Sequence, residues 1–157
     1  MIKSNYEKNN HLISIIVPSF NSINFIENCL QSVQSQSYEN WELLVIDGGS
    51  SDGTISKVKE LEKKDSRISL INNSEDNGPA QARAFGINQC NGSYIAFLDS
   101  DDEWLPEKLT NQLKFMDENN IHFSFTNYKL ILENGRVSYA QFYGWKKNSY
   151  RQYLRRR

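Results

Sequence analysis

The sequence has few of the residues that build disulfide frameworks and zinc centres. It contains two cysteines, Cys29 and Cys90, which form no CxxC pair, and two histidines, His11 and His122. A structural zinc site takes four closely spaced ligands of these types, so this composition excludes a His/Cys zinc site. We expect both cysteines to be buried thiols within helical segments.

Long apolar runs are also missing from the 157 residues. No stretch approaches the roughly 18–20 apolar residues of a membrane-spanning helix, and the first five residues have no apolar signal-peptide core. We therefore expect a cytoplasmic protein. Hydrophobic residues make up 38% of the chain and charged residues 24%. These fractions favour a packed core over disorder, and the length suits one domain.

Acidic residues are absent after Glu133. Residues 1–133 hold 11 Lys/Arg and all 19 Asp/Glu, a net charge of −8, whereas residues 134–157 hold 7 Lys/Arg and no acid. An acidic body argues against a nucleic-acid-binding domain, because the folded body of such a domain is basic. We expect a flexible lead-in at 1–11, a folded core at 12–133 and a basic, aromatic tail at 134–157.

Short β-branched apolar runs alternate with segments of helical periodicity. Strands are expected at 12–17, 42–46, 67–71 and 93–98, and helices at 23–36, from about 52, from 79 and from 106. Further strands are expected at 121–132, as one strand or as two with a bend, and at 137–143, around a hairpin turn at 133–136. In the third helix, Ala80, Ala84 and Ile87 are expected to face the core. The alternation predicts an α/β domain with a mostly parallel central sheet flanked by helices.

Polar residues gather at the ends of the first four expected strands or at the start of the helix that follows each strand. In an open α/β sheet, ligands bind beyond the carboxyl ends of the strands, so clusters at these ends are candidate site residues. The four clusters are Pro18-Ser19-Phe20-Asn21, Asp47-Gly48-Gly49-Ser50, Asp76-Asn77-Gly78 with Arg83, and Asp99-Ser100-Asp101-Asp102. We expect the sheet to bring them to one edge although they lie far apart along the chain.

Each cluster has a functional and a plain structural interpretation. The carboxylates at 99–102 repel one another, and Mg²⁺ or Mn²⁺ would remove that repulsion; otherwise they form a solvated loop in which Asp102 or Glu103 stabilises the next helix. Phe20 offers a face for a nucleobase or is a core aromatic. Arg83 contacts a ribose or phosphate or is a surface residue. Gly48 and its neighbours allow a ligand to approach or form an ordinary β–α turn.

Two common nucleotide-binding fingerprints are absent. The sequence has no GxGxxG and no GxxxxGK[ST], so NAD-type and P-loop sites lack support. A nucleotidyltransferase would need a loop rich in glycine and basic residues after the first strand. Residues 18–22 contain neither glycine nor lysine, which argues against that class.

Taken in order, the clusters and the strands before them resemble the family 2 glycosyltransferases, which are inverting enzymes with the GT-A fold, a Rossmann-like nucleotide-diphospho-sugar transferase fold. The resemblance covers roughly residues 12–130 and rests on 14–21, 42–54, 77–83 and 92–109. It is greatest to bacterial enzymes of capsule, O-antigen or exopolysaccharide synthesis. It implies transfer of a sugar from a UDP-, GDP- or dTDP-linked donor to a saccharide or a lipid-linked saccharide.

The resemblance implies roles for the matching positions. The donor nucleotide would contact Pro18, Ser19, Phe20, Asn21, Asp47, Gly48, Asn77, Gly78, Arg83, Asp99 and Ser100. Phe20 would pack on the nucleobase, and Arg83 would contact the nucleotide. Asp99-Ser100-Asp101 matches the DxD motif, so Asp101, together with Asp99, would bind Mn²⁺ or Mg²⁺.

The sequence departs from the family pattern in two places. Many relatives have a second acid where Gly48 stands, so GDP and dTDP remain alternatives to UDP. The family's general base is an acid in a later segment, but no acid follows Glu133. We therefore expect an N-terminal fragment whose C-terminal part is truncated, and the alternative function is nucleotide binding without turnover. The basic tail would contact the inner face of the cell membrane or form a solvated helix.

Overall fold

The computed structural model describes residues 11–74, 78–131 and 136–140. The chain divides into two compact units, residues 1–114 and residues 115–157.

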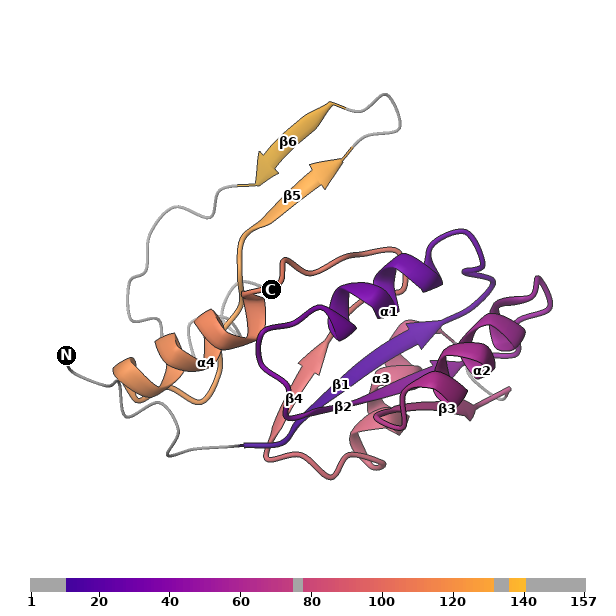
Figure 1. Cartoon of the computed structure of the whole chain (residues 1–157), viewed down its shortest axis with the longest axis horizontal. Helices are drawn as coiled ribbons and strands as arrows, with labels where there is room; N and C mark the ends of the chain where they lie inside the picture. Colours follow the sequence, from indigo (N-terminus) through magenta and orange to yellow (C-terminus); the bar gives the residue numbers. More distant parts are fainter. Residues whose placement is uncertain (1–10, 75–77, 132–135, 141–157) are drawn as a thin grey trace, which may run out of the picture. The chain divides into compact units, whose positions relative to one another are not determined.

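A four-stranded parallel sheet forms the centre of the first unit (Figure 1). Its strands are β1 (Ile13–Ser19), β2 (Trp41–Asp47), β3 (Ile68–Asn72) and β4 (Tyr94–Phe97), in the order β3-β2-β1-β4. All seven residues of β1 are buried, as expected of a central strand covered on both faces. The parallel sheet and the predicted α/β class are therefore confirmed.

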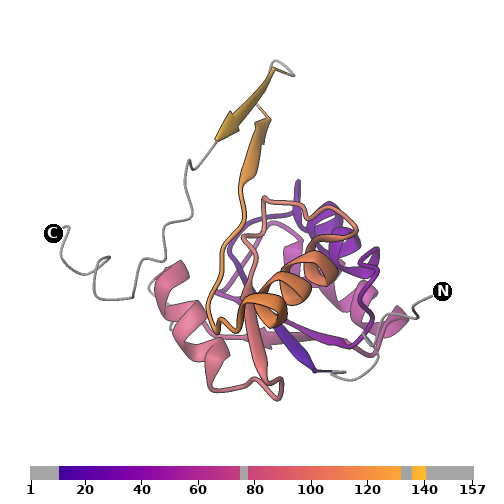
Figure 2. The same ribbon diagram turned by 90° about the vertical axis from the view of Figure 1, so that its left-hand side faces the viewer.

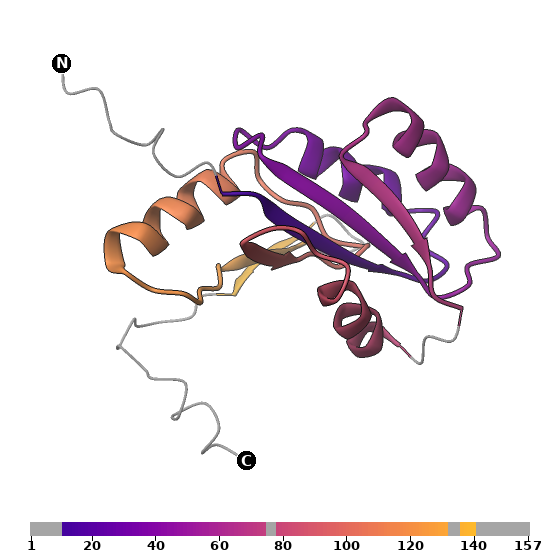
Figure 3. The ribbon, with the colours of Figure 1, turned by 90° about the horizontal axis from the view of Figure 1, so that it is seen from below.

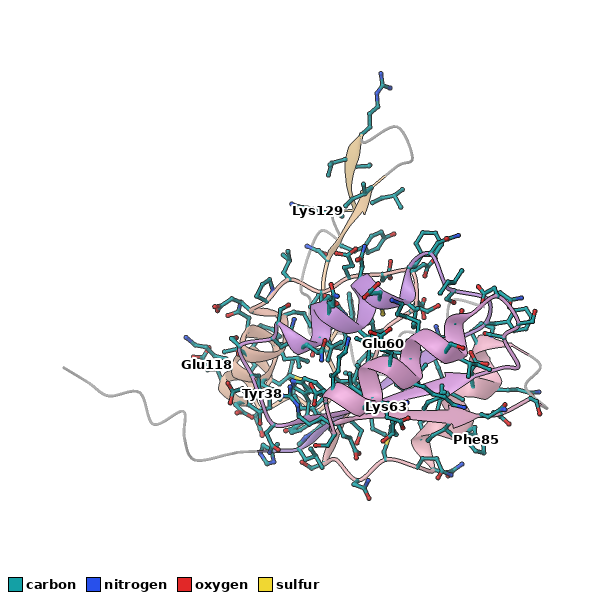
Figure 4. The ribbon with its side chains drawn as sticks, turned by 45° about the vertical axis from the view of Figure 1, so that its right-hand side comes forward. Tyr38, Glu60, Lys63, Phe85, Glu118 and Lys129 are labelled. Carbon is teal, nitrogen blue, oxygen red and sulfur yellow. The ribbon has the colours of Figure 1, made fainter. Side chains whose placement is uncertain are left out.

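Helices cover both faces of this sheet. Figures 2 and 3 show α1 (Ile26–Gln34) and α2 (Thr54–Lys64) on one side and α3 (Pro79–Ile87) on the other. The larger apolar core lies beneath α1 and α2, and a smaller cluster built on Ile16 and Ile46 lies beneath α3. Figure 4 labels Phe85, which packs on this smaller cluster.

The buried face of α3 differs from the predicted one. Ala80 and Ala84 are exposed and Ile87 is 45% exposed, whereas Ala82 and Gly86 are buried. A methyl group added to Gly86 would lie 2.8 Å from Cγ2 of Ile16, so the helix approaches the sheet through its smallest side chains. Because three alanines give little hydrophobic periodicity, the sequence could not identify this face.

Element boundaries also differ from the predicted ones. Helix α1 is shorter than the expected 23–36, and α4 (Lys108–Asn119) begins two residues after Pro106. Cys29 is buried in α1 as expected, whereas Cys90 is half-buried and follows the end of α3. Within the described residues no helix is long and apolar enough to cross a membrane.

The second unit contains an antiparallel pair of strands, β5 (Tyr128–Ile131) and β6 (Val137–Ala140). The expected strand at 121–132 is therefore wrong over 121–127, which form no regular structure. Residues 121–125 alternate in polarity as a strand does, but a strand also needs a hydrogen-bonded neighbour. In this segment only 128–131 pair with another strand of the described chain. The turn at 132–135 and residues 141–143 of the other expected strand lie outside the described part of the chain.

Candidate functional site

A cavity of about 500 Å³ opens at the carboxyl edge of the parallel sheet. The segments that follow β1, β2 and β4 meet there with the start of α3. The cavity is lined by Pro18, Ser19, Phe20, Gly48, Gly78, Pro79, Arg83, Asp99, Ser100 and Asp101. The strand-end clusters thus gather at one edge, as the topology predicts. Only Pro79 was missed, because the sequence marked it simply as a helix start.

Phe20 and Ser19 both line this cavity. Phe20 is 64% exposed, so its interpretation as a core aromatic is wrong. Ser19 is 5% exposed, and its buried Oγ has no hydrogen-bond partner among the residues that the structure describes. A buried hydroxyl without a partner costs about 1–3 kcal/mol. A ligand that bonded to Ser19 would remove this cost.

Asp47 and Asn21, two of the predicted site residues, do not line the cavity. The buried Asp47 carboxylate accepts hydrogen bonds from the backbone N–H of Gly49 (3.0 Å) and of Ser50 (2.7 Å) and from the Ser50 hydroxyl (2.6 Å). Asn21, at a φ of 49°, donates its backbone N–H to Ser50 Oγ and accepts from the Ser51 N–H. Both residues therefore shape the loops that carry the cavity. Asn77 lies outside the described residues.

Three hydroxyl and carboxyl side chains that the sequence analysis did not select also fix these loops. The Ser22 backbone N–H donates to Thr54 Oγ1 (2.9 Å), and the hydroxyls of Ser22 and Ser100 are 2.8 Å apart. Asp52 accepts from the Ile23 N–H (3.0 Å) and from the Thr54 hydroxyl (2.6 Å). An Asp two residues before a Thr at a helix start is a recognisable turn signal that could have identified them.

The acidic loop after β4 is only partly neutralised. Arg83 of α3 forms an ion pair with Asp99, so Arg83 is part of the site rather than a remote surface residue. Burial, followed by the charges of Asp101 and Asp99, raises the pKa of Asp102. The alternative in which Asp102 or Glu103 stabilises the next helix is not supported, because α4 begins at Lys108 and has no acid in its first turn.

Cys29 lies behind this acidic loop and is chemically inert. Its thiol donates to the backbone oxygen of Asp99 (3.5 Å). Burial and the neighbouring acids raise the pKa of Cys29 to about 12. Because the thiolate is the reactive form, this residue serves packing and not chemistry.

The cavity offers two carboxylates to a metal ion, Asp99 and Asp101. Among the described residues no three His, Cys, Asp or Glu side chains converge to hold a metal by themselves. Mg²⁺ and Mn²⁺ sites commonly use one or two carboxylates together with phosphate oxygens and waters. The donor set therefore fits a cation shared with a bound phosphate and does not fit one held by protein ligands alone.

Several curated bacterial proteins are similar in sequence to this chain. It is 43% identical over 124 residues to the putative teichuronic acid biosynthesis glycosyltransferase TuaG of Bacillus subtilis, covering 79% of this chain and 49% of TuaG. It is 44% identical over 145 residues to the Escherichia coli protein WfgD, a UDP-Glc:alpha-D-GlcNAc-diphosphoundecaprenol beta-1,3-glucosyltransferase, covering 92% of this chain and 56% of WfgD. The chain thus spans about half the length of these relatives.

Solved structures of glycosyltransferases are similar to this chain in fold. Staphylococcus aureus TarS 1–349 in complex with UDP matches with a TM-score of 0.63 and 31% identity, over 69% of this chain and 32% of TarS. The mannosyltransferase PcManGT of Pyrobaculum calidifontis, in complex with GDP-Man and Mn²⁺, matches with a TM-score of 0.65 and 26% identity, over 69% of this chain and 33% of PcManGT. The fold is therefore the GT-A fold of such glycosyltransferases. Residues 14–157 match the description "Glycosyl transferase family 2", and the chain belongs to that family.

Proposed function

We propose that this chain supplies the donor site of a metal-dependent, inverting glycosyltransferase that uses a nucleoside-diphosphate sugar in bacterial surface-polysaccharide synthesis. The observation that carries the proposal is the cavity at the carboxyl edge. Phe20, Ser19, Arg83, Asp99 and Asp101 all line it, and the buried Ser19 hydroxyl has no partner among the described residues. An aromatic face, a hydroxyl, a cation and two acids are the groups that a nucleobase, a ribose and a diphosphate would need.

Each lining group has a distinct task in this proposal. The Phe20 ring packs on the nucleobase, and Ser19 Oγ bonds to the nucleoside. Arg83 faces the diphosphate and balances its charge. Asp101, with Asp99, holds the Mg²⁺ or Mn²⁺. A bound divalent cation would neutralise the diphosphate and stabilise negative charge on the leaving nucleoside diphosphate.

The relatives support the reaction class but leave the base open. WfgD is named for a UDP-glucose donor and a diphosphoundecaprenol-linked acceptor, and PcManGT for GDP-Man and Mn²⁺. By analogy we propose a lipid-linked saccharide acceptor at the cytoplasmic face of the membrane. Gly48 lines the cavity with no side chain of its own to select a base. UDP, GDP and dTDP donors are therefore all candidates.

A second candidate function is binding of the donor nucleotide without turnover. Inversion needs a carboxylate that accepts the proton of the acceptor hydroxyl. In the donor proposal Asp99 and Asp101 are occupied by the arginine and the cation, and no acid follows Glu133. The basic residues that would contact a membrane, Lys146, Lys147 and Arg155–Arg157, lie outside the described residues.

Calorimetric titration of the chain with UDP, GDP and dTDP, each with and without Mg²⁺ or Mn²⁺, tests the donor site. We expect one nucleotide to bind more tightly with the metal, and Asp101→Ala to abolish that difference. Asp117→Ala, which removes a carboxylate from the exposed face of α4, is the control and should keep it. Absent or metal-independent binding of all three nucleotides would overturn the proposal.

A further inference from the structure

A second groove, of about 420 Å³, lies apart from the donor cavity and shares no lining residue with it. One wall is a stripe along α1, and the other is the segment that follows the acidic loop. The lining residues are Asn28, Gln31, Ser32, Ser35, Glu103 and Trp104. Five of the six carry a hydroxyl, amide or carboxylate group, and the sixth carries an indole.

The rim of this groove has hydrogen-bonding groups that no described residue uses. Asn28 and Gln31 are exposed, lie one turn apart on α1, and have side-chain amides with no partner in the described part of the chain. The same holds for the Glu103 carboxylate, which faces no cation there, and for the indole N–H of Trp104. Exposed amides, a carboxylate and an indole N–H together provide both donors and acceptors for a ligand.

The floor of the groove is held in place by hydrogen bonds. Ser32 Oγ donates to the backbone oxygen of Cys29 (2.7 Å) and accepts the backbone N–H of Trp104 (3.1 Å). The Ser35 hydroxyl donates to the backbone oxygen of Ser32 (3.0 Å). Because the hydroxyls of Ser32 and Ser35 already have hydrogen-bond partners, they hold fixed positions. A ligand would bond instead to the side chains of the groove that have no partner among the described residues. Such preorganisation reduces the entropy lost on binding.

Lys108 and Gln36 also hold Trp104 and the residues that follow it in place. The ammonium of Lys108 lies 3.6 Å from the centroid of its ring, and burial lowers the pKa of Lys108 to about 8. Gln36 donates to the backbone oxygen of Leu105 (2.8 Å) and accepts the backbone N–H of Leu109 (3.0 Å). The ammonium occupies one face of the indole, so a ligand could not stack on that face.

The composition of the groove indicates the chemistry of its ligand. Glu103 is the one charged lining residue, and Asp101 and Asp102 precede it directly in the chain. Phosphates and uronic acids would be repelled by this charge. A peptide would need apolar pockets or a free strand edge, neither of which this groove supplies. Hydroxyl-rich neutral compounds match side-chain amides, a carboxylate and an indole edge.

We propose that this groove binds a neutral saccharide. Its identification as part of the acceptor, outside the sugar that reacts, rests on the proposed function, whereas saccharide binding itself does not. Glu103 and Trp104 lie two and three residues after Asp101, which lines the donor cavity. A chain held here would therefore contact the same loop that carries Asp101.

Nuclear magnetic resonance titration of the isotope-labelled 157-residue chain tests the proposal. The probes are chitobiose and cellobiose as neutral disaccharides and digalacturonate as the charged one. We expect a neutral probe to shift backbone signals in 28–35 and 103–104. Gln31→Ala should weaken its binding about fivefold, the effect of about one net hydrogen bond. Gln89→Ala, an exposed glutamine after α3, is the matched control and should not change it.

The groove proposal and the donor proposal fail in distinguishable ways. Shifts elsewhere than at the groove, no shifts at all, or equal binding of digalacturonate would overturn the groove proposal. A parallel titration with UDP, GDP and dTDP in Mg²⁺ reports on the donor cavity through residues 18–20 and 99–101. If the chain binds a neutral saccharide but no nucleotide, saccharide binding in the groove is supported and its role as part of the acceptor site is overturned. If the chain binds a nucleotide but no saccharide, only the donor-site proposal is supported.

Discussion

The two edges of the parallel sheet use the same kinds of polar residues in opposite ways. At the amino edge, the Glu42 carboxylate accepts from the Ser14 hydroxyl and from the backbone and side-chain N–H groups of Asn91. At the carboxyl edge, Asp99, Asp101 and Asp102 share one ion pair within the described residues, with Arg83, and the buried Ser19 hydroxyl has no partner there. The Glu42 carboxylate and the carboxylates of the acidic loop therefore differ in how far neighbouring groups satisfy them, not in their type.

This contrast separates stability from function. The hydrogen bonds of Glu42 at the amino edge lock β1, β2 and the turn before β4 together. Among the described residues, the indole N–H of Trp41 is the one buried side-chain group at this edge without a partner. Repelling carboxylates and an unpartnered hydroxyl at the carboxyl edge cost folding free energy that a ligand would restore. Substitutions at the amino edge should therefore change stability alone, and relief of repulsion at the carboxyl edge should increase it.

The largest effect is expected for Gly92→Ala at the amino edge. An added methyl group would lie 2.6 Å from the backbone nitrogen of Ser14 and 2.7 Å from the backbone oxygen of Leu12. Backbone atoms of a central strand cannot move aside, so we expect a loss of about 3 kcal/mol in the free energy of unfolding. Urea unfolding measures this loss, and Ser93→Ala at the next, exposed position is the control, expected within about 0.5 kcal/mol.

Nucleotide titration of the Gly92→Ala variant tests whether the two edges are independent. The folded fraction of the variant should bind a nucleotide with the same affinity as the wild-type chain. Normal stability of the variant, or a loss of nucleotide affinity in its folded fraction, would contradict the comparison.

Glu42→Gln should have a smaller effect that depends on pH. Burial alone would raise the pKa of Glu42, but hydrogen bonds from Ser14, Asn91 and Gly92 outweigh it and lower the pKa below its usual value. Ionised Glu42 therefore stabilises the fold above about pH 4.3, and this contribution is lost as the pH falls through the lowered folded-state pKa. We expect the variant to be about 1.5 kcal/mol less stable at pH 7, the value of a charged hydrogen bond.

The pH dependence identifies the cause of that loss. The difference between wild type and Glu42→Gln should narrow as the pH falls through the lowered folded-state pKa of Glu42, because the wild-type side chain then becomes neutral as well. Denaturant unfolding at pH 7 and pH 3.5 measures it, with Glu107→Gln, an exposed glutamate, as the control. A difference that stays constant with pH would mean that the carboxylate charge has no part in this edge.

The sequence predicted the four parallel strands and the gathering of their carboxyl ends because both follow from apolar runs and chain topology. It could not predict which way a side chain at a strand end turns. Asp47 and Asp99 both directly follow or end an apolar run, yet Asp47 is fully buried under its own loop whereas Asp99 is 52% exposed and paired with Arg83. The face of α3 was also unpredictable, because close packing through Gly86 has no hydrophobic signature.

The smallest effect is expected for Asp102→Asn at the carboxyl edge, and its sign is opposite. Burial and the charges of Asp101 and Asp99 raise the pKa of Asp102, so its ionised form destabilises the fold. Removing the charge should stabilise the chain by a few tenths of a kcal/mol at pH 7, a small gain because water screens this exposed residue. The gain should shrink as the pH falls through the raised folded-state pKa, since wild-type Asp102 is then neutral as well. Asp117→Asn on α4 is the control. Thermal unfolding of both variants and of the wild type at pH 7 and pH 4 measures the difference in stability. Destabilisation by Asp102→Asn at pH 7 would show that the acidic loop is satisfied as fully as the amino edge, which would remove the physical reason for expecting a cation there.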